Sequence, residues 1–151
     1  MNTPDIEPQL LPSLQFSVRL VPPSLVQRFS DYARPYIKRA LDKSGEGFEA
    51  DDILQYTITG QVQLWLIAEG QRVVGAATTE IVKYPTQRFC RVCTIAGSKF
   101  DEWVEYFLLE LEPYARSQNA TNVQAYVRRG FVPKLLQYGF KPKCVTVTKQ
   151  L

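Results

Sequence analysis

Histidine is absent from the 151-residue sequence, and cysteine occurs only three times. Histidine is the commonest general base near neutral pH and the commonest protein ligand of metal ions. Its absence removes the simplest route to both kinds of chemistry. We therefore predict no metal site in this chain.

The CxxC spacing of Cys90 and Cys93 does not overturn that prediction. Both residues lie in a segment, residues 88–95, whose pattern is that of a strand. Residues three apart on a strand face opposite sides of the sheet and cannot hold one ion together. Buried structural thiols are the favoured interpretation, with zinc binding or redox chemistry as the alternative.

Long apolar runs and a leader segment are missing as well. No run approaches the roughly 18 apolar residues that a membrane-spanning helix needs. No basic segment followed by an apolar core begins the chain, so we predict neither secretion nor a membrane partner. The odd number of cysteines without a leader indicates reduced thiols in a cytosolic setting. The net charge of +3 is too small to indicate nucleic-acid binding by itself.

The first half of the chain predicts an arm followed by strand, helix, helix and a hairpin. Residues 1–13 are rich in proline and lack a period, so we expect an extended arm ahead of a single domain, residues 14–151. Residues 14–21 alternate as a strand. A helix follows, with a kink or break expected at Pro35. Its expected buried stripe is Leu25, Phe29, Tyr32, Tyr36, Ile37 and Leu41. Further elements are expected at residues 50–57 (helix), 63–68 and 72–84 (strands of a hairpin).

The second half continues with alternating strands and helices. Residues 88–96 are expected to complete an antiparallel meander, and a helix begins at Ser98, which with Asp101 resembles a capping box. Its stripe is Phe100, Val104, Phe107, Leu108, Leu111 and Ala115. Core packing is favoured for Trp65 and Trp103, whereas Tyr126 is a candidate for lining a groove. A strand at residues 123–127, a helix within 128–143 and a last strand at 144–148 complete a mixed α/β domain.

This succession resembles the Gcn5-related N-acetyltransferase (GNAT) fold, a central, mostly antiparallel sheet flanked by helices. More narrowly, QLWLIAEGQRVVGAATTEIVKYP (residues 63–85) and RRGFVPKLLQYGF (residues 128–140) resemble GNAT-like proteins encoded among the head and tail genes of bacteriophages. Some of those proteins are linked to internal virion components or head assembly. The resemblance implies a place in the virion or the host cytoplasm, and a phage structural protein or a host protein as partner.

An acetyltransferase of this fold carries an Arg/Gln-x-x-Gly-x-Gly/Ala loop, whose backbone N–H groups hold the pyrophosphate of acetyl-CoA at a helix N-terminus. The corresponding stretch here is TIAGSKFDEW, residues 94–103, with one glycine. The resemblance makes Ile95, Gly97, Ser98 and Lys99 candidate cofactor-binding residues. Asp101 and Glu102 follow in the first helical turn, where they stabilise a helix but repel a phosphate.

The catalytic residues of the fold are not clearly matched. The family's tyrosine, which protonates the leaving thiolate, falls at Leu135; Tyr138 is the nearest candidate and points elsewhere. Glu80 is the candidate general base on a central strand, with an exposed strand carboxylate as the favoured alternative.

The last helix has a basic end. Arg128 and Arg129, two more candidates for cofactor binding, cluster with Lys134, Lys141 and Lys143. This charge suits a nucleotide phosphate, an acidic protein partner or packaged DNA; a merely solvated basic end is the alternative.

Two functional hypotheses follow. The favoured one is a phage GNAT-fold protein that has become a non-catalytic virion-associated, assembly or binding component, with a degenerate acetyl-CoA site. The alternative is an active N-acetyltransferase that uses acetyl-CoA to modify a protein amine, where catalysis rests mainly on positioning.

Overall fold

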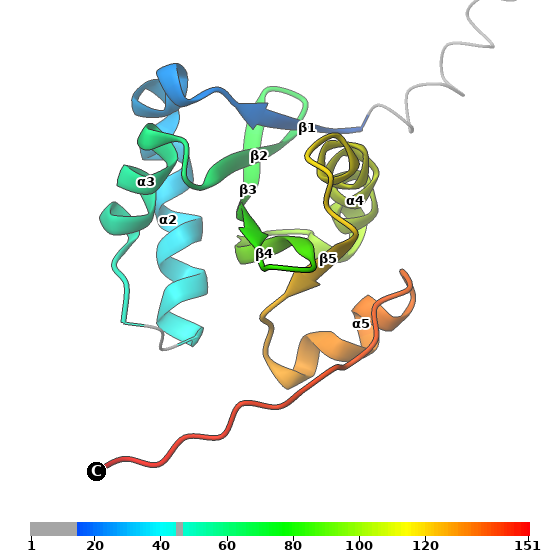
Figure 1. Cartoon of the computed structure of the whole chain (residues 1–151). Helices are drawn as coiled ribbons and strands as arrows, with labels where there is room; N and C mark the ends of the chain where they lie inside the picture. The colour runs from blue at the N-terminus through cyan, green and yellow to red at the C-terminus, as the bar shows by residue number, and fades with distance from the viewer. Residues whose placement is uncertain (1–14, 45–46) are drawn as a thin grey trace, which may run out of the picture.

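The computed structural model describes residues 15–44 and 47–151 (Figure 1). The expected arm, residues 1–13, lies outside the described residues. The mixed α/β class is confirmed: a five-stranded sheet with the order β1-β2-β3-β4-β5 is flanked by helices. The strands are β1 (Phe16–Val21), β2 (Gln63–Glu69), β3 (Arg72–Lys83), β4 (Arg88–Gly97) and β5 (Asn122–Ala125). The helices are η2 (Pro23–Leu25), α2 (Val26–Ser44), α3 (Ala50–Thr59), α4 (Phe100–Ser117), η3 (Arg129–Phe131) and α5 (Val132–Leu136).

Helices cover both faces of the sheet, as Figure 1 shows. Alternate residues of β2 divide between two cores. Trp65 and Ile67 pack beneath α4, whereas Leu64 and Leu66 pack beneath α2 and α3. The first four strands pair antiparallel, and β4 pairs with β5 in parallel. The expected hairpin and meander are therefore confirmed, and so is core packing for Trp65 and Trp103, the latter fully buried.

Helix α2 runs from Val26 to Ser44 without the break expected at Pro35. A proline inside a helix costs about 3 kcal/mol because it removes a hydrogen bond and clashes with the preceding turn. Burial of one helical face opposes that cost. The buried residues of α2 are Val26, Ala33, Ile37 and Leu41. Two residues expected in the buried stripe, Leu25 and Tyr32, are exposed instead.

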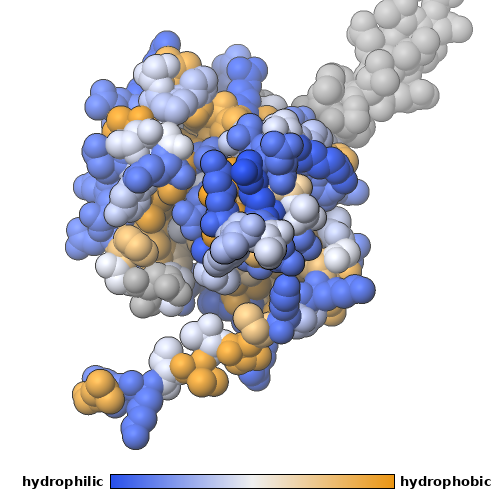
Figure 2. Space-filling model, in the orientation of Figure 1, coloured by the Kyte–Doolittle hydropathy of each residue, from blue (hydrophilic) through white to orange (hydrophobic). Residues whose placement is uncertain are grey.

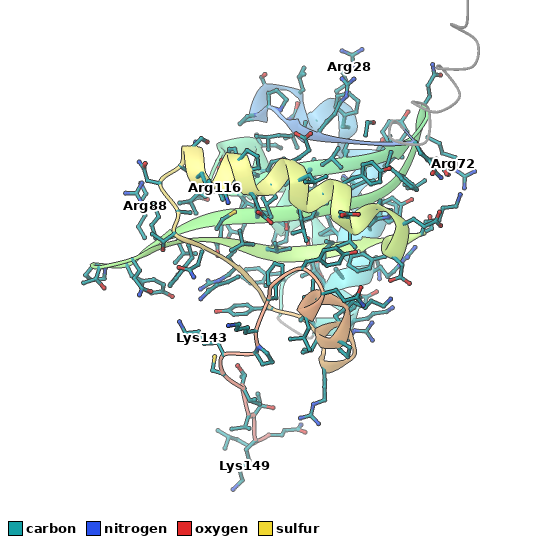
Figure 3. The ribbon with its side chains drawn as sticks, turned by 90° about the vertical axis from the view of Figure 1, so that its right-hand side faces the viewer. Arg28, Arg72, Arg88, Arg116, Lys143 and Lys149 are labelled. Atoms are coloured by element: carbon teal, nitrogen blue, oxygen red, sulfur yellow. The ribbon has the colours of Figure 1, made fainter. Side chains whose placement is uncertain are left out.

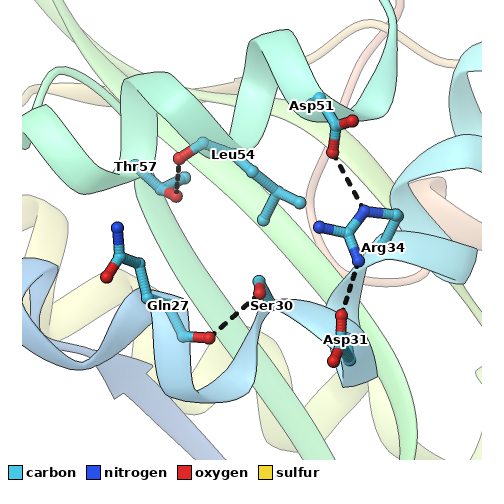
Figure 4. Close-up of polar contacts among 7 residues, drawn as sticks. All are labelled: Gln27, Ser30, Asp31, Arg34, Asp51, Leu54 and Thr57. Carbon is cyan, nitrogen blue, oxygen red and sulfur yellow. Dashed lines mark hydrogen bonds and ion pairs between the residues drawn. The ribbon is translucent and has the colours of Figure 1, made fainter.

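Helices α2 and α3 are joined at the surface by one arginine (Figure 4). The Nε of Arg34 donates to Asp51 of α3 at 2.9 Å, and its Nη1 donates to Asp31 of α2 at 2.7 Å. Exposed ion pairs of this kind contribute little stability. Burial of the apolar faces of the two helices is the stronger attraction between them.

The start of α4 differs from the expected capping box. The residue that precedes the helix is Lys99, in the left-handed conformation (φ 60°), and no side chain caps the helix. Ser98 instead turns toward β3, and its hydroxyl donates to the carbonyl of Val74 at 3.4 Å. The buried stripe of α4 is confirmed except for Phe100, which is partly buried, and it also includes Trp103.

The C-terminal part also differs from expectation. Strand β5 ends at Ala125, two residues earlier than expected, and α5 is a single short helix. The strand expected at residues 144–148 is absent: residues 141–151 form no helix or strand. A strand needs a hydrogen-bonded neighbour, and the alternating pattern of this segment cannot supply one by itself.

Candidate functional site: the start of helix α4 and the adjacent groove

The loop between β4 and α4 is held by contacts within the chain. The backbone N–H of Ser98 donates to the carbonyl of Val74 at 2.9 Å. The carbonyl of Ser98 in turn accepts the indole N–H of Trp103 at 2.7 Å. Both backbone groups of this residue are therefore engaged. The candidate Ser98 has no backbone donor left for a ligand.

Gly97 is a glycine because of packing inside the protein. A Cβ at this position would lie 2.5 Å from the carbonyl oxygen of Val74 and 2.9 Å from the ring of Trp103. In a phosphate-binding loop the missing side chain leaves room for the ligand. Here β3 and the Trp103 ring fill that room.

Two ion pairs and a pair of rings surround the first turn of α4. The ammonium of Lys99 donates to both carboxylate oxygens of Glu69, at 2.9 and 3.0 Å. Lys134 of α5 pairs with the carboxylate of Asp101. The rings of Phe100 and Phe131 meet edge to face, 5.2 Å between centroids. The N-terminal parts of α4 and α5 are thereby joined to each other.

These contacts fit the pyrophosphate of acetyl-CoA poorly. A phosphate at a helix N-terminus needs free N–H groups and favours positive charge. The Ser98 N–H and the Lys99 ammonium are already bonded, and Glu69, Asp101 and Glu102 add negative charge close by. The candidate Lys99 therefore serves as a partner of Glu69 in this structure.

The strands leave an opening beside this loop. Parallel pairing of β4 with β5 ends at Val92 opposite Ala125, whereas β4 continues to Gly97. A bulge lies at the same place: Val92 pairs with Thr79 and Thr94 with Thr78, so Cys93 has no opposite residue in β3. A bulge bends its strand and increases the local twist. On the α4 side the space holds a cavity of about 20 Å³ lined by apolar side chains, among them the candidate Ile95.

A groove of about 1910 Å³ extends from this opening toward the C-terminal end of α2. The described residues that line it carry many more cations than carboxylates. The cations are Arg39, Lys43, Arg91, Arg116, Arg128, Arg129, Lys141 and Lys143, and the carboxylates are Glu80 and Glu112. Figure 3 shows Arg88 and Arg116 at one end of the molecule and Lys143 below the sheet. The groove thus favours an anionic occupant.

Glu80 lies on the groove wall, paired across the strands with Arg91. Arg91 Nη1 donates to the Glu80 carboxylate at 3.3 Å, and its Nη2 donates to the Tyr84 hydroxyl at 3.3 Å. The guanidinium stacks over the ring of Tyr126, 4.6 Å from the centroid. Among the described residues, the buried Nε of Arg91 has no hydrogen-bond partner. Glu80 is therefore a half-buried, ion-paired carboxylate rather than a free one.

The two neighbouring thiols are protonated at neutral pH. Burial raises the pKa of Cys90 to about 11. Burial, and next the charge of Glu80, raise the pKa of Cys93 to about 12. Cys90 packs in the core beneath α4, whereas Cys93 faces the groove. The two side chains face opposite sides of the sheet and do not meet at one site.

The remaining candidates lie on the far side of the groove. Tyr138 is partly buried against the core beneath α4, and its N–H donates to the carbonyl of Leu135 at 3.0 Å. Arg128 lies over the ring of Phe131 at 5.3 Å, and Arg129 is exposed in the short turn η3. The structure thus brings Glu80, Tyr138 and both arginines to one groove. It does not join them by direct contact.

The sequence analysis missed Arg91 and the contacts of Lys134. The pairing of Arg91 with Glu80 could have been predicted by counting residues back along both strands from the turn between β3 and β4. Strands β3 and β4 pair without irregularity from Lys83 opposite Arg88 back to Glu80 opposite Arg91. The contact of Lys134 with Asp101 had no such signal, because it depends on how α5 packs on α4.

Metal binding and membrane insertion find no support in the described part of the chain. No group of three or more Cys, Asp or Glu side chains in residues 15–44 and 47–151 could hold a metal ion. Among the described helices, none combines the length and the apolar character that crossing a bilayer requires.

Solved structures similar to this one are acetyltransferases. An aminoglycoside acetyltransferase from an uncultured soil metagenomic sample superposes with a TM-score of 0.68 at 11% identity, over 90% of this chain and 98% of that one. A predicted acetyltransferase of Clostridium acetobutylicum, solved with acetyl-CoA, gives 0.66 at 14% identity, over 89% and 96%. A GNAT family acetyltransferase of Staphylococcus aureus gives 0.58 at 14% identity, over 91% and 99%.

Sequence comparisons add nothing to this likeness: no family model and no curated protein matches the chain. At 8–14% identity the similarity concerns the backbone alone. The chain has the fold of the GNAT acetyltransferases.

Proposed function

We propose that this protein is a GNAT-fold binding component that holds another protein and does not transfer acetyl groups. The observation that carries the proposal is that two donor groups at the start of α4 already have partners within the chain. The Ser98 N–H bonds to Val74 and the Lys99 ammonium to Glu69. A phosphate would have to compete with each of these contacts, in a place that already carries carboxylates.

The groove supports a protein partner with an acidic segment. Among the described residues, eight basic and two acidic side chains line it, together with exposed rings such as those of Tyr84 and Tyr126. Tyrosine and arginine are enriched where proteins bind one another. We place this role among the virion or assembly proteins of a bacteriophage, on the resemblance of residues 63–85 and 128–140. A phage structural protein or a host protein is then the expected occupant.

An active N-acetyltransferase acting on a protein amine is the second candidate. The opening between β4 and β5 after Val92 supports it, together with the similarity of this backbone to that of a predicted acetyltransferase solved with acetyl-CoA. In that case Glu80, facing the groove, is the candidate base. Its pairing with Arg91 opposes the role, since a base must be free to accept a proton.

A thermal-shift titration with acetyl-CoA, and with ATP as a phosphate control, separates the two candidates. A ligand at about a hundred times its Kd stabilises the native state by about 2.7 kcal/mol, a shift of several degrees. We expect no shift specific to acetyl-CoA up to millimolar concentration, and no acetyl transfer to a peptide mixture above a heat-killed control.

A shift with acetyl-CoA alone, or acetyl transfer above that control, would favour the enzyme. A shift with both ligands would indicate only an anion site in the basic groove. The Lys99→Ala variant then locates the binding, because it removes the ammonium at the start of α4 and leaves the groove cations in place.

A further inference from the structure

Arg91 lies on the wall of the basic groove, and its guanidinium is incompletely bonded. Nη1 donates to the Glu80 carboxylate and Nη2 to the Tyr84 hydroxyl, each at 3.3 Å, which is long for a hydrogen bond from a charged donor. The buried Nε has no partner among the described residues. A buried donor without a partner is unfavourable, because water no longer reaches it. The guanidinium therefore favours a further acceptor.

The incompletely bonded edge matches an acceptor with two oxygens. Nε and Nη2 project side by side from the planar guanidinium, as a fork that fits the two oxygens of a carboxylate. The Tyr84 hydroxyl has one oxygen and reaches Nη2 alone. A carboxylate in its place would bond both nitrogens, and both bonds would be charge-assisted. One long contact would thus be replaced by a bidentate pair.

The two tyrosines beside Arg91 differ in what they do to the guanidinium. The ring of Tyr126 lies 4.6 Å from the guanidinium carbon and holds the plane of the group by stacking. Tyr84 directly follows β3, is half-exposed, and meets the ring of Phe89 edge to face. Its side chain can turn toward water without leaving a cavity in the core. Arg91 is thus held in place, whereas the group at its edge is replaceable.

The charge beside this edge favours a carboxylate over a phosphate. Glu80, bonded to Nη1 of the same guanidinium, keeps a negative charge next to the site. Repulsion between like charges grows with the charge of the ligand. A phosphate with two negative charges is therefore opposed more strongly than a carboxylate with one.

Further cations near Arg91 fit an acidic segment better than one isolated carboxylate. The Lys143 ammonium lies 5.9 Å from the ring centre of Phe89, two residues before Arg91 on β4. Arg128 follows Tyr126 by two residues and also lines the groove. In the view of Figure 2, hydrophilic residues gather around β4 and β5. Several acidic residues in one segment would neutralise several of these cations.

We propose that Arg91 is the anchor of the groove: a Glu or Asp side chain from an acidic segment of the partner protein binds Nε and Nη2, and Tyr84 turns away. The inference rests on the proposed function, because it names the contact by which the groove holds its partner. Arg91 then determines which partner binds tightly. The other groove cations contribute mainly long-range attraction, which speeds association more than it strengthens binding.

Fluorescence anisotropy at low ionic strength tests the anchor. The probe is a short labelled peptide in which Glu alternates with Ser, and its Gln counterpart is the uncharged control. We expect saturable binding of the Glu peptide only. Arg91→Met should weaken that binding by about tenfold or more, and Arg91→Lys, which keeps the charge without the fork, by nearly as much.

Two further arginines serve as matched controls. Arg116→Met removes a groove cation that pairs with Glu112, and should weaken binding by less than about threefold. Arg28→Met removes the same charge on the opposite side of the sheet from Lys143 (Figure 3), and should leave binding unchanged. Because loss of Arg91 leaves Glu80 without its partner, Arg91→Met is also compared in a Glu80→Gln background. Far-UV circular dichroism checks that each variant is folded.

A second variant separates the anchor from a merely structural role. Tyr84→Phe removes the hydroxyl that the carboxylate displaces, and it keeps the ring beside Phe89. It should bind the Glu peptide more tightly than the natural chain. In nitrogen-15 NMR, the Nε–H proton of Arg91 should move downfield with the Glu peptide and stay in place with the Gln peptide.

The outcomes that contradict the anchor differ from those that contradict the proposed function. Equal losses from Arg91→Met and Arg116→Met, or an Nε–H signal that does not respond, would overturn the anchor and leave an acidic protein as the occupant of the groove. Tighter binding of the same peptide with phosphoserine in place of Glu would overturn the choice of a carboxylate. No binding of the Glu peptide would overturn both the anchor and the acidic partner, whereas acetyl transfer is judged by the acetyl-CoA titration.

Discussion

The indole N–H of Trp103 donates to the carbonyl of Ser98 at 2.7 Å, and this bond holds the loop before α4 against the core. The Trp103 ring is fully buried. Its edge lies against Gly75 and Gly97, where Cβ atoms would approach the ring to 2.8 and 2.9 Å. One side of the loop that binds phosphate in acetyltransferases of this fold is here packed against Val74 and Trp103, whereas Ser98 and Lys99 remain exposed on its other side. Predictions about stability and predictions about ligand binding therefore concern the same residues.

The Gly97→Ala variant should be markedly less stable than the natural protein. A Cβ there would lie 2.5 Å from the carbonyl oxygen of Val74, which is backbone and cannot rotate away. Overpacking of this kind costs about 1–3 kcal/mol in free energy of unfolding. Urea denaturation measures it. Gly130→Ala is the matched control, with nothing within 4 Å of the new Cβ, and should change stability by less than about 0.5 kcal/mol.

The Glu80–Arg91 pair should show measurable coupling. Its side chains are 35% and 15% exposed, whereas those of the exposed pair Asp42–Lys38 are 60% and 67% exposed. A double-mutant cycle of Glu80→Gln and Arg91→Met should give a coupling of about 1 kcal/mol, against about 0.3 kcal/mol for the exposed pair. Equal couplings in the two cycles would mean that the groove wall does not shield Glu80 from solvent.

The Glu69 carboxyl should titrate below its ordinary pKa. The hydrogen bonds from Lys99, and next the one from Gln15, lower the pKa of this carboxyl from 4.5. A pKa lowered by folding adds stability above pH 4.5, and this stability is lost as the pH falls through the lower, folded-state value. Carboxyl carbon NMR should show the Glu69 pKa rising toward 4.5 in Lys99→Met. It should stay low in Lys83→Met, a change at an exposed lysine at the end of β3.

Cys90 and Cys93 should be unreactive in the native protein. Burial is the main cause of their raised pKa values, about 11 and about 12, so almost no thiolate is present at pH 8. The Cys144→Ser variant, which lacks the exposed thiol, should therefore show no fast reaction with a disulfide reagent at pH 8. The same variant should titrate two thiols in denaturant. Fast native reaction at either cysteine would indicate a site opened by motion or activated by a neighbour.

Local patterns predicted most of the elements in this protein. The apolar, β-rich runs of β2, β3 and β4 and the 3–4 spacing of Val104, Phe107 and Leu111 extend over many residues. Strand β2 buries both of its faces, whereas α4 buries one, and each pattern is visible within the element itself. Of the two outcomes expected at Pro35, a kink or a break, the break was wrong because burial of the opposite helical face, unseen in the local sequence, opposes the cost of the proline.

The candidate site was less predictable, because its contacts join segments far apart in the chain. Lys99 meets Glu69 across 30 residues, and Lys134 approaches Asp101 through the packing of α5 on α4. Spacing along the sequence carries no record of such approaches. Residues 144–148 show the reverse case: they have the pattern of a strand, but no segment of the described chain pairs with them.

The most direct test of the central claim is an amide NMR titration with acetyl-CoA that follows Ser98, Lys99, Phe100 and Asp101. The account predicts that these four amides do not shift up to millimolar acetyl-CoA, because the Ser98 N–H is bonded to Val74, the Lys99 ammonium is bonded to Glu69, and the carboxylates of Asp101 and Glu102 repel a phosphate. Saturable shifts at these amides, absent with ATP, would contradict it. They would mean that the loop opens to hold the cofactor and that the protein retains the binding step of an acetyltransferase.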